Sequence, residues 1–507
     1  MDFWIKASQL LLSLSLLIVL HEFGHYIPAR IFKTRVEKFY LFFDWKFSLF
    51  KKKIGDTEWG IGWIPLGGYV KIAGMIDESM DKEQMEKPAE PWEFRSKPAW
   101  QRLIIMLGGV TVNLILGMVI YIFIVFTWGE RQIPAQDLKL GMAIHPYMEQ
   151  FGVKSGDNIL EVDGKPVMHF SDITKELLLR GGRKLTVLRA NGETKKITLP
   201  DDIDYKLFIS GSTDIAGYRR KTRKVAGVMT SMDSKDKLFK SGDGIHKIDG
   251  KTIDKIDLTD KAYLSKTHKV IIVRDGDTSE VRTNKREFKS LLRAAPAMAG
   301  GLKPNDSIVA VNDQPIIYHD EIVSQLYEKR NKNTKLTVIR NNSDTINISA
   351  YVSKSGSVGF NAGELTSSDT TAAKTIYYGF GESIGKGIGR GTETLGDYVG
   401  QLKFIFTKKG ASSLGGFGAI GGLFPSTWQW QPFWEITAFI SIILAFMNIL
   451  PIPALDGGHV VFLLYEIITG KEAPEKVLEY AQYVGIIILL GLLIYANGND
   501  IFKAITG

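Results

Sequence analysis

Four apolar segments constrain the fold of this 507-residue chain more than any other feature. A helix needs about 20 apolar residues to cross the roughly 30 Å hydrocarbon core of a bilayer. The segments lie at about 4–27, 102–127, 433–455 and 480–497. The last one is short, so a buried helix of a soluble protein is its alternative. The sequence therefore predicts a polytopic α-helical membrane protein with about four transmembrane helices.

Composition separates the two ends of the chain from its middle. Apolar residues make up 45% of the chain and gather at the ends, whereas the region from Gln132 to Asn361 is polar. The net charge is +8, but basic and acidic residues interleave without a basic and aromatic strip, so we expect no nucleic-acid partner. The absence of cysteine excludes disulfides and thiolate metal sites, which leaves His and carboxylate as strong metal ligands.

Basic residues near the span ends predict the orientation. They are Arg30, Lys33, Arg35 and Lys38 after the first span, and Arg95, Lys97 and Arg102 before the second. Short loops rich in Lys and Arg stay in the cytoplasm. We therefore expect loop 28–101 to be cytoplasmic, and both termini and residues 128–432 to lie outside. The first apolar run has no small-residue cleavage site, so we expect a retained span rather than a signal peptide.

The first span ends in a metal-binding pattern. His21-Glu22-Phe23-Gly24-His25 follows the apolar run from Leu10 to Leu20. On a helix, the two His side chains of such an H-E-x-x-H pattern lie one turn apart on one face, with the Glu beside them. Ionisable groups are costly inside a bilayer and usually mark function there. The pattern predicts metal-assisted hydrolysis in or at the edge of a membrane; a His that only bonds a neighbouring helix is the alternative.

A catalytic zinc ion needs a third protein ligand and one open position. Asp456 is the strongest candidate, because the first and third spans run in the same direction and each carries a polar motif at its inner end. Pro451 and Pro453 break the third span, and the freed backbone groups require burial in protein or a wet cavity. Asn448 is expected to bind substrate in that cavity or to pack between helices. His459 is another possible ligand, expected instead to face solvent or to support a ligand.

The polar middle contains a repeated pattern. Its copies begin at Val153, Phe239 and Leu302. Each predicts a turn, a strand, a tight turn, a second strand and a closing strand, the last at 185–189, 270–274 and 336–340. Each also predicts a helical stretch before the closing strand, such as 172–179 in the first copy and 321–326 in the third. The pattern resembles PDZ domains, which bind an extended peptide as an added strand. We expect PDZ-like domains at 128–215 and 286–362, with 216–285 either a degenerate third domain or an insertion.

Together these motifs resemble the site-2 protease family of intramembrane zinc metalloproteases. The resemblance covers nearly the whole chain and includes Gly67-Gly68-Tyr69-Val70-Lys71 and Gly108-Gly109-Val110-Thr111-Val112-Asn113. It implies that His21, His25 and Asp456 bind Zn²⁺ and that Glu22 activates water. Candidate substrate contacts are Asn448, Gly67, Gly68, Tyr69 and Asn113.

Two further segments are expected to assist. Trp59–Ile64 and Tyr69–Ile72, joined through Gly67 and Gly68, predict a β-hairpin similar to the membrane-reentrant sheet of the family. Its edge strand would hold an unwound substrate by strand addition, and an ordinary cytoplasmic hairpin is the alternative. Within 363–432, the Gly-rich amphipathic stretch Tyr377–Phe406 is expected to lie along the outer membrane surface, either gating access or only anchoring.

Residues 1–127 and 433–507 would then form two catalytic membrane halves of a bacterial inner-membrane protein. The leading hypothesis is a zinc endopeptidase that cuts transmembrane segments of single-span proteins, such as anti-sigma factors, or remnant signal peptides, after another protease removes their outer part. Its PDZ-like domains would bind peptide or C-terminal segments and exclude bulky outer domains. One alternative is a PDZ scaffold or sensor with a structural metal. The other is a membrane zincin that cuts soluble cytoplasmic-face substrates and uses a downstream Glu as ligand.

Overall fold

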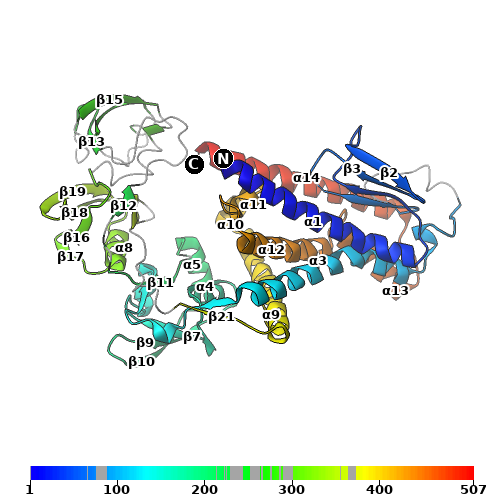
Figure 1. Ribbon diagram of the computed structural model, residues 1–507, viewed down its shortest axis with the longest axis horizontal. Coiled ribbons are helices and arrows are strands. Elements are labelled where there is room, and N and C mark those ends of the chain that lie inside the picture. The colour runs from blue at the N-terminus through cyan, green and yellow to red at the C-terminus, as the bar shows by residue number, and fades with distance from the viewer. Residues whose placement is uncertain are drawn as a thin grey trace. The chain divides into compact units, whose positions relative to one another are not determined.

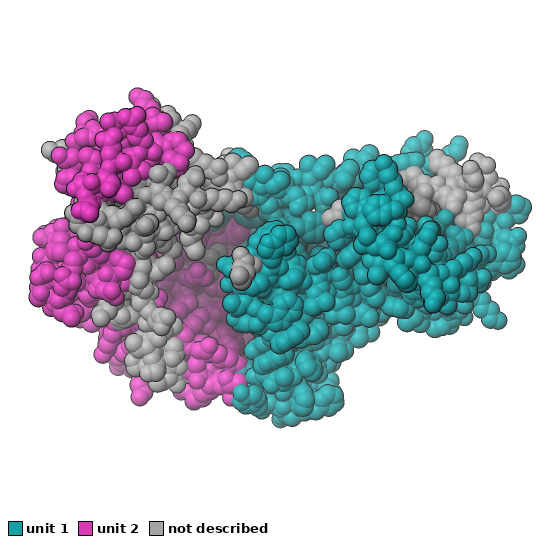
Figure 2. Space-filling model, turned by 45° about the horizontal axis from the view of Figure 1, so that its top comes forward, with its two compact units in different colours: residues 1–130, 376–504 teal, residues 131–375, 505–507 magenta. Residues whose placement is uncertain are grey.

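The chain forms two compact units, residues 1–130 with 376–504 and residues 131–375 with 505–507 (Figures 1 and 2). The computed structural model describes residues 2–65, 67–75, 88–212, 214–221, 223, 225–228, 244–251, 263, 266–274, 277–284, 287–288, 301–353, 356–362 and 373–506. We refer to the first unit as the membrane unit, because it contains all the long apolar helices, and to the second as the sheet unit.

Among the described residues, four helices are long and apolar enough to cross a membrane. They are α1 (Asp2–Ile31), α3 (Ala99–Trp128), α12 (Trp430–Ile449) and residues Lys476–Phe502 of α14 (Glu475–Thr506). The prediction of a membrane protein is thus confirmed. The third span is shorter than predicted: α12 ends at Ile449, because Pro451 and Pro453 cannot continue it, and α13 (Asp456–Thr469) begins only at Asp456.

Helix α3 packs against α1 and against α12 through small residues. A Cβ atom at Gly108 of α3 would overlap the carbonyl oxygen of Gly24 in α1, so the two backbones touch. Towards α12, the Ser441 hydroxyl donates a hydrogen bond to the backbone carbonyl of Asn113 (2.7 Å). Close backbone contact and interhelical hydrogen bonds are what holds helices together where lipid removes the hydrophobic driving force.

The loop between α1 and α3 forms a four-stranded sheet in the order β2-β3-β1-β4. Its strands are β1 (Val36–Leu41), β2 (Phe50–Ile54), β3 (Thr57–Ile61) and β4 (Tyr69–Ile72). The predicted hairpin of Trp59–Ile64 with Tyr69–Ile72 is wrong, because β1 lies between β3 and β4. The hairpin is instead β2 with β3, around Gly55.

Aromatic pairs explain why β1 takes the central place. Phe39 stacks on its cross-strand partner Trp59 in β3 (4.6 Å between ring centroids), and the next residue, Tyr40, stacks on Tyr69 in β4 (5.4 Å). Such cross-strand pairs stabilise a sheet by a few tenths to about 1 kcal/mol each. Among the described residues, no strand pairs with the outer edge of β4.

The predicted amphipathic stretch Tyr377–Phe406 contains helix α9 (Phe380–Ile405), which is followed by α10 (Lys408–Ser413) and α11 (Phe417–Leu423). Its glycine side packs against α3: a Cβ atom at Gly387 would overlap the backbone of Ile122, and Gly391 lies against Met118. The glycines of α9 therefore serve close helix packing. Its location along the outer membrane surface stays a prediction.

The sheet unit contains two copies of one topology. The first copy consists of β7 (Asn158–Val162), β8 (Lys165–Pro166), α4 (Phe170–Leu178), β9 (Lys184–Leu188) and β10 (Thr194–Thr198). The other consists of β16 (Ser307–Val311), β17 (Gln314–Pro315), α8 (His319–Glu328), β18 (Asn333–Arg340) and β19 (Asp344–Tyr351). The sheet orders β10-β9-β7-β8 and β19-β18-β16-β17 correspond strand for strand.

A buried ion pair recurs at the same place in both copies. Arg189, directly after β9, binds Asp157 and the carbonyl of Gly152. Arg340, at the end of β18, binds Asp306 (2.7 Å) and the carbonyl of Gly301. The Asp of each repeated turn is therefore paired with the Arg of the closing strand, which gives the repeat a physical reason. That these copies are PDZ-like domains stays a prediction.

The middle copy is smaller, with the sheet β13 (Gly244–Ile248), β14 (His268–Arg274) and β15 (Asp277–Thr283). Residues 239–243 and 252–253 of the predicted repeat lie outside the described residues. The remaining short elements are η1 (Phe94–Ser96), β5 (Glu130–Gln132), η2 (Ala135–Asp137), β6 (Met142–Ile144), η3 (Pro146–Phe151), α5 (Ile203–Ser210), β11 (Ala216–Tyr218), β12 (Val225–Val228), β20 (Phe360–Ala362) and β21 (Lys374–Ile376).

The middle sheet yields a pH-dependent prediction at Asp249. Partial burial opposes ionisation of this carboxyl, but hydrogen bonds from His268 (2.7 Å), the Lys269 N–H and Tyr263 outweigh it and lower its pKa. A lowered folded-state pKa stabilises the fold above the unfolded pKa of about 3.9, and this contribution is lost as the pH falls through the folded value.

We therefore expect Asp249→Asn to speed hydrogen exchange of the β14 amides at pH 7. The difference from wild type should shrink when both proteins are compared at pH 3. Equal exchange rates of the two proteins at pH 7 would contradict the assignment.

Candidate metal centre

Three side chains from two distant parts of the sequence converge in the membrane unit. His21 and His25 lie one turn apart on α1, and Asp456 is the first residue of α13. Their facing atoms form a nearly equilateral triangle: 3.3 Å between the two Nε2 atoms, and 3.4 Å from each Nε2 to Oδ2 of Asp456. A tetrahedral zinc ion with ligand bonds of about 2.0–2.1 Å requires ligand separations of about 3.3–3.4 Å.

A second observation also indicates that the three ligand atoms could hold a metal ion. Oδ2 of Asp456 is buried and has no hydrogen-bond donor among the described residues. A buried carboxylate oxygen without a donor or cation is costly. Two imidazoles and one carboxylate leave the fourth tetrahedral position open, which is the arrangement of catalytic rather than structural zinc sites.

Helix α3 orients both histidine rings without supplying a ligand. The Nδ1 of His25 lies 2.8 Å from the carbonyl oxygen of Ile105. Because a carbonyl only accepts, Nδ1 carries the proton and Nε2 presents its lone pair towards Asp456. The ring is thus held in the tautomer that a metal requires.

Asn113 of α3 holds the other ring. Its side-chain amide lies 3.2 Å from Nδ1 of His21, and its Oδ1 is buried without a partner. With the amide oxygen assigned to the position facing His21, Oδ1 accepts from the Nδ1–H of His21, and Nε2 of His21 presents its lone pair to the cluster. Asn113, expected as a substrate contact, contacts Nδ1 of His21 in this structure, and its contact with substrate stays a prediction.

Glycines make room for the cluster. A Cβ atom at Gly109 would lie 2.6 Å from Cε1 of His21 and closer still to Nε2 of His25. Glu22 is buried, and Gly68, just before β4, faces it: a Cβ atom there would lie 3.5 Å from Cγ of Glu22 and 2.6 Å from Cγ2 of Ile18. The sheet therefore borders the catalytic candidate directly.

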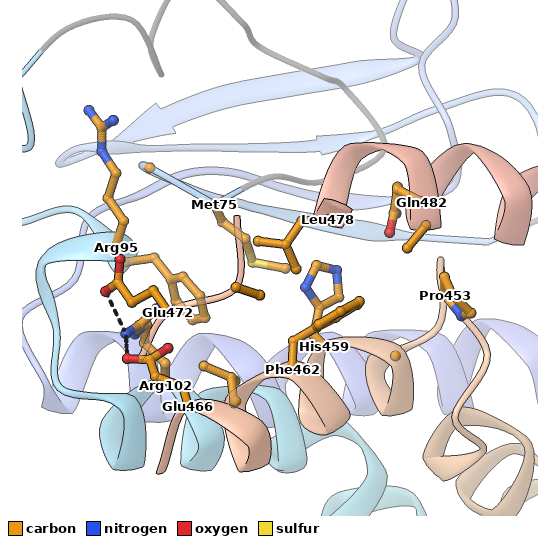
Figure 3. Close-up of a pocket in the computed structure, with 16 residues that line it drawn as sticks. Met75, Arg95, Arg102, Pro453, His459, Phe462, Glu466, Glu472, Leu478 and Gln482 are labelled. Carbon is orange, nitrogen blue, oxygen red and sulfur yellow. Dashed lines mark hydrogen bonds and ion pairs between the residues drawn. The ribbon is translucent and has the colours of Figure 1, made fainter. Parts of the chain in front are cut away.

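The other expected site residues lie at different distances from the three ligand atoms. The amide of Asn448, in the last turn of α12, is 3.4 Å from Nε2 of His21, so it reaches the edge of the triangle. Gly67 packs against the ring of Phe43, and the Tyr69 hydroxyl donates to Asp44 (2.9 Å) within the sheet. His459 is outside the cluster and lines a separate cavity (Figure 3).

The non-helical segment 450–455 between α12 and α13 positions Asp456, and α14 packs against this segment. The backbone N–H of Ala454, which has a φ of 73°, donates to Oε1 of the buried Gln482 (3.2 Å). A Cβ atom at Gly485 would overlap the carbonyl of Pro453. Sequence reasoning included Gly109 only as part of a family motif, without its contact to the histidines, and it missed Gln482 and Gly485, because only the folded structure reveals their contacts.

Comparison with known proteins identifies the class to which this fold and site belong. The sequence pattern of Peptidase family M50 matches residues 9–492, so the chain belongs to that family. Full-length relatives named "Putative zinc metalloprotease" occur in Thermotoga maritima (26% identical, 97% of this chain and 98% of the relative) and Xylella fastidiosa strain Temecula1 (25%, 99% and 99%). Another occurs in Vibrio cholerae (25%, 97% and 97%). The protein is a membrane zinc metalloprotease.

Gly109→Ala tests the geometry of the centre. The added methyl group would overlap both histidine rings, so we expect the purified protein to lose its zinc, as measured by elemental analysis, while it remains monodisperse in detergent. The control is Gly491→Ala in α14, because no atom lies within 4 Å of that Cβ position. Full zinc content in Gly109→Ala would refute the described packing of α3 against the two histidines.

Proposed function

We propose that this protease cuts peptide bonds of membrane-spanning substrates at a zinc ion held by His21, His25 and Asp456. The observation that carries the proposal is the triangle of their ligand atoms, 3.3–3.4 Å apart, where the inner end of α1 meets the break after α12. Ionisable side chains are rarely gathered at such a place without a function.

Glu22 is the proposed general base. Bound zinc supplies a Lewis acid that polarises the scissile carbonyl and lowers the pKa of water toward about 7. Glu22 takes up the proton of the attacking water and passes it to the leaving amine. Glu22 is buried, and its Cγ lies beside Gly68, where a substrate along β4 would begin. The amide of Asn448 is placed to bond the substrate backbone beside the cluster.

The substrate must be extended when it is cut, whereas a membrane helix satisfies its backbone internally. Strand β4 is the end strand of its sheet, and among the described residues no strand pairs with its outer side, so we place the added substrate strand there. Because Gly68 precedes this strand and lies against Glu22, a peptide paired with β4 passes the proposed catalytic group.

The wider role follows from the resemblance to the bacterial regulator-of-sigma-E protease within the site-2 family. In this proposal the enzyme resides in the bacterial inner membrane, with its site toward the cytoplasm. It cuts single-span proteins of the anti-sigma-factor type, and remnant signal peptides, after a first protease acts outside. The two repeated domains at 128–215 and 286–362 are PDZ-like, bind peptide or C-terminal segments and exclude substrates with bulky outer domains.

Glu22→Gln should separate chemistry from metal binding. The amide keeps the size of the carboxylate but cannot accept the proton, so we expect full zinc content and loss of cleavage of a model single-span substrate in detergent. Cleavage at the wild-type rate would exclude Glu22 as the base. A wild-type protein that binds zinc but never cleaves would instead favour a scaffold with a structural metal.

Asp456→Ala tests the third ligand against a downstream Glu. Removing one of three protein ligands should lower the zinc content sharply and abolish cleavage. His459→Ala, three residues further along α13, serves as the control and should keep its zinc. Unchanged zinc content in Asp456→Ala would refute the ligand set and favour a zincin with a different third ligand.

A further inference from the structure

The four-stranded sheet between α1 and α3 exposes apolar side chains at one end. We call Trp45, Phe47, Leu49, Phe50 and Trp63 the apolar tip; the first four of these side chains are 56–65% exposed. Phe47 stacks on Trp63 (5.5 Å between ring centroids), and the Trp63 indole N–H donates a hydrogen bond to the carbonyl of Trp45 (2.8 Å). The tip is thus an ordered surface, and the bonded indole can enter an apolar phase without an unpaired donor.

The course of β1 places the tip at the depth of a membrane span. Val36, at the start of β1, packs with Ala29 of α1 in one buried cluster. Near the other end of β1, the Cβ position of Gly68 lies 2.7 Å from the carbonyl oxygen of Tyr40 and 2.6 Å from Cγ2 of Ile18. Strand β1 therefore runs back along α1 toward its apolar half, and the tip comes after β1 in that direction. Because α1 is long and apolar enough to cross a membrane, the tip lies where lipid surrounds the helix.

Strand β2 leads from the tip back toward the end of α1. Its last residue, Ile54, lies opposite Thr57, whose hydroxyl donates to the carbonyl of Val36 (2.8 Å). The side chains between the tip and this point are exposed and basic: Lys51, Lys52 and Lys53. Because a strand advances about 3.3 Å per residue, these lysines lie within about 10 Å of the tip, a distance comparable with the thickness of a headgroup layer.

Lysines also occur on edge strands because they discourage pairing with other chains. Strand β10, an edge strand of the sheet unit, carries the exposed neighbours Lys195 and Lys196. The turn before β10 is polar, with the sequence Asn191-Gly192-Glu193. Strand β2 differs from β10 because its lysines follow an exposed apolar tip beside a membrane span. Protection of the edge explains the lysines of β2 but not the tip.

We propose that the apolar tip and the lysines of β2 form a binding surface for anionic phospholipids in the leaflet around the C-terminal end of α1. The tip contacts acyl chains, and Lys51, Lys52 and Lys53 pair with the negative groups of the headgroups. Lys46 lies over the ring of Trp45 (4.5 Å) and extends its ammonium group to the same level. This surface is separate from the proposed zinc chemistry and adds a lipid partner to the protein.

Nitroxide-labelled lipids test the surface on the full-length protein. Because the chain has no cysteine, Leu49→Cys provides a single site for a fluorophore at the tip. The labelled protein is placed in phosphatidylcholine vesicles that contain increasing fractions of nitroxide-labelled phosphatidylglycerol or nitroxide-labelled phosphatidylcholine. We expect both lipids to quench the fluorophore. Phosphatidylglycerol should do so at an at least fivefold lower fraction, since each lysine near an anionic surface contributes about a factor of five in affinity.

A matched pair of variants locates the charge. Lys51→Gln/Lys52→Gln removes two lysines whose cross-strand partners are uncharged, and it should abolish the preference for phosphatidylglycerol. Lys195→Gln/Lys196→Gln is the control, because these lysines are also neighbours in an edge strand and face uncharged residues. The control should keep the preference. In wild type, about 1 M NaCl should also abolish it, because the Debye length falls to about 3 Å.

The absence of quenching by either lipid would overturn the placement of the tip in the membrane. Equal quenching by the two lipids, a preference that survives in Lys51→Gln/Lys52→Gln, or one that persists at about 1 M NaCl would overturn the anionic-lipid surface. Cleavage of the model substrate in detergent is measured without phosphatidylglycerol. An enzyme that cleaves but shows no lipid preference would therefore refute only this surface, and one that prefers the lipid but never cleaves would refute only the proposed function.

Discussion

Ligand atoms of one zinc ion lie about 3.3 Å apart, so the helices that carry and orient them must approach without intervening side chains. In this protein the requirement falls on α1 and α3, whose backbones touch at Gly24 and Gly108. That contact brings the Ile105 carbonyl to His25 and the Asn113 amide to His21. Helix α3 thus contributes no ligand, yet it determines which nitrogen each histidine presents.

The proposed third ligand, Asp456, raises a different problem, because a residue inside a regular helix is surrounded by the side chains of its own turn. Here α12 stops at Ile449 and α13 starts at Asp456, so the carboxylate extends from a helix end. A chain break within an apolar unit needs partners for its backbone. Gln482 and the close approach of Gly485 supply them, which gives α14 a structural role although it carries no ligand.

Local sequence patterns predicted the spans and the His-Glu-His motif, because each depends on residues close together in the sequence. The candidate Asp456 came from its own local motif together with the shared direction of the first and third spans. Sequence reasoning failed where partners are chosen over distance: consecutive strands were paired, whereas Phe39 and Tyr40 of β1 attract Trp59 and Tyr69 from either side. It also did not reveal the contact of Asn113 with His21, because the sequence does not show which face of α3 meets that histidine. The repeated pairs Arg189 with Asp157 and Arg340 with Asp306 lay within reach of sequence reasoning, since each copy has an Asp in its first turn and an Arg at its closing strand.

The non-helical segment after α12 contributes residues to two sites. Toward α1 it presents Asp456, and on its other side Pro453 and Gly458 form part of the wall of the cavity in Figure 3.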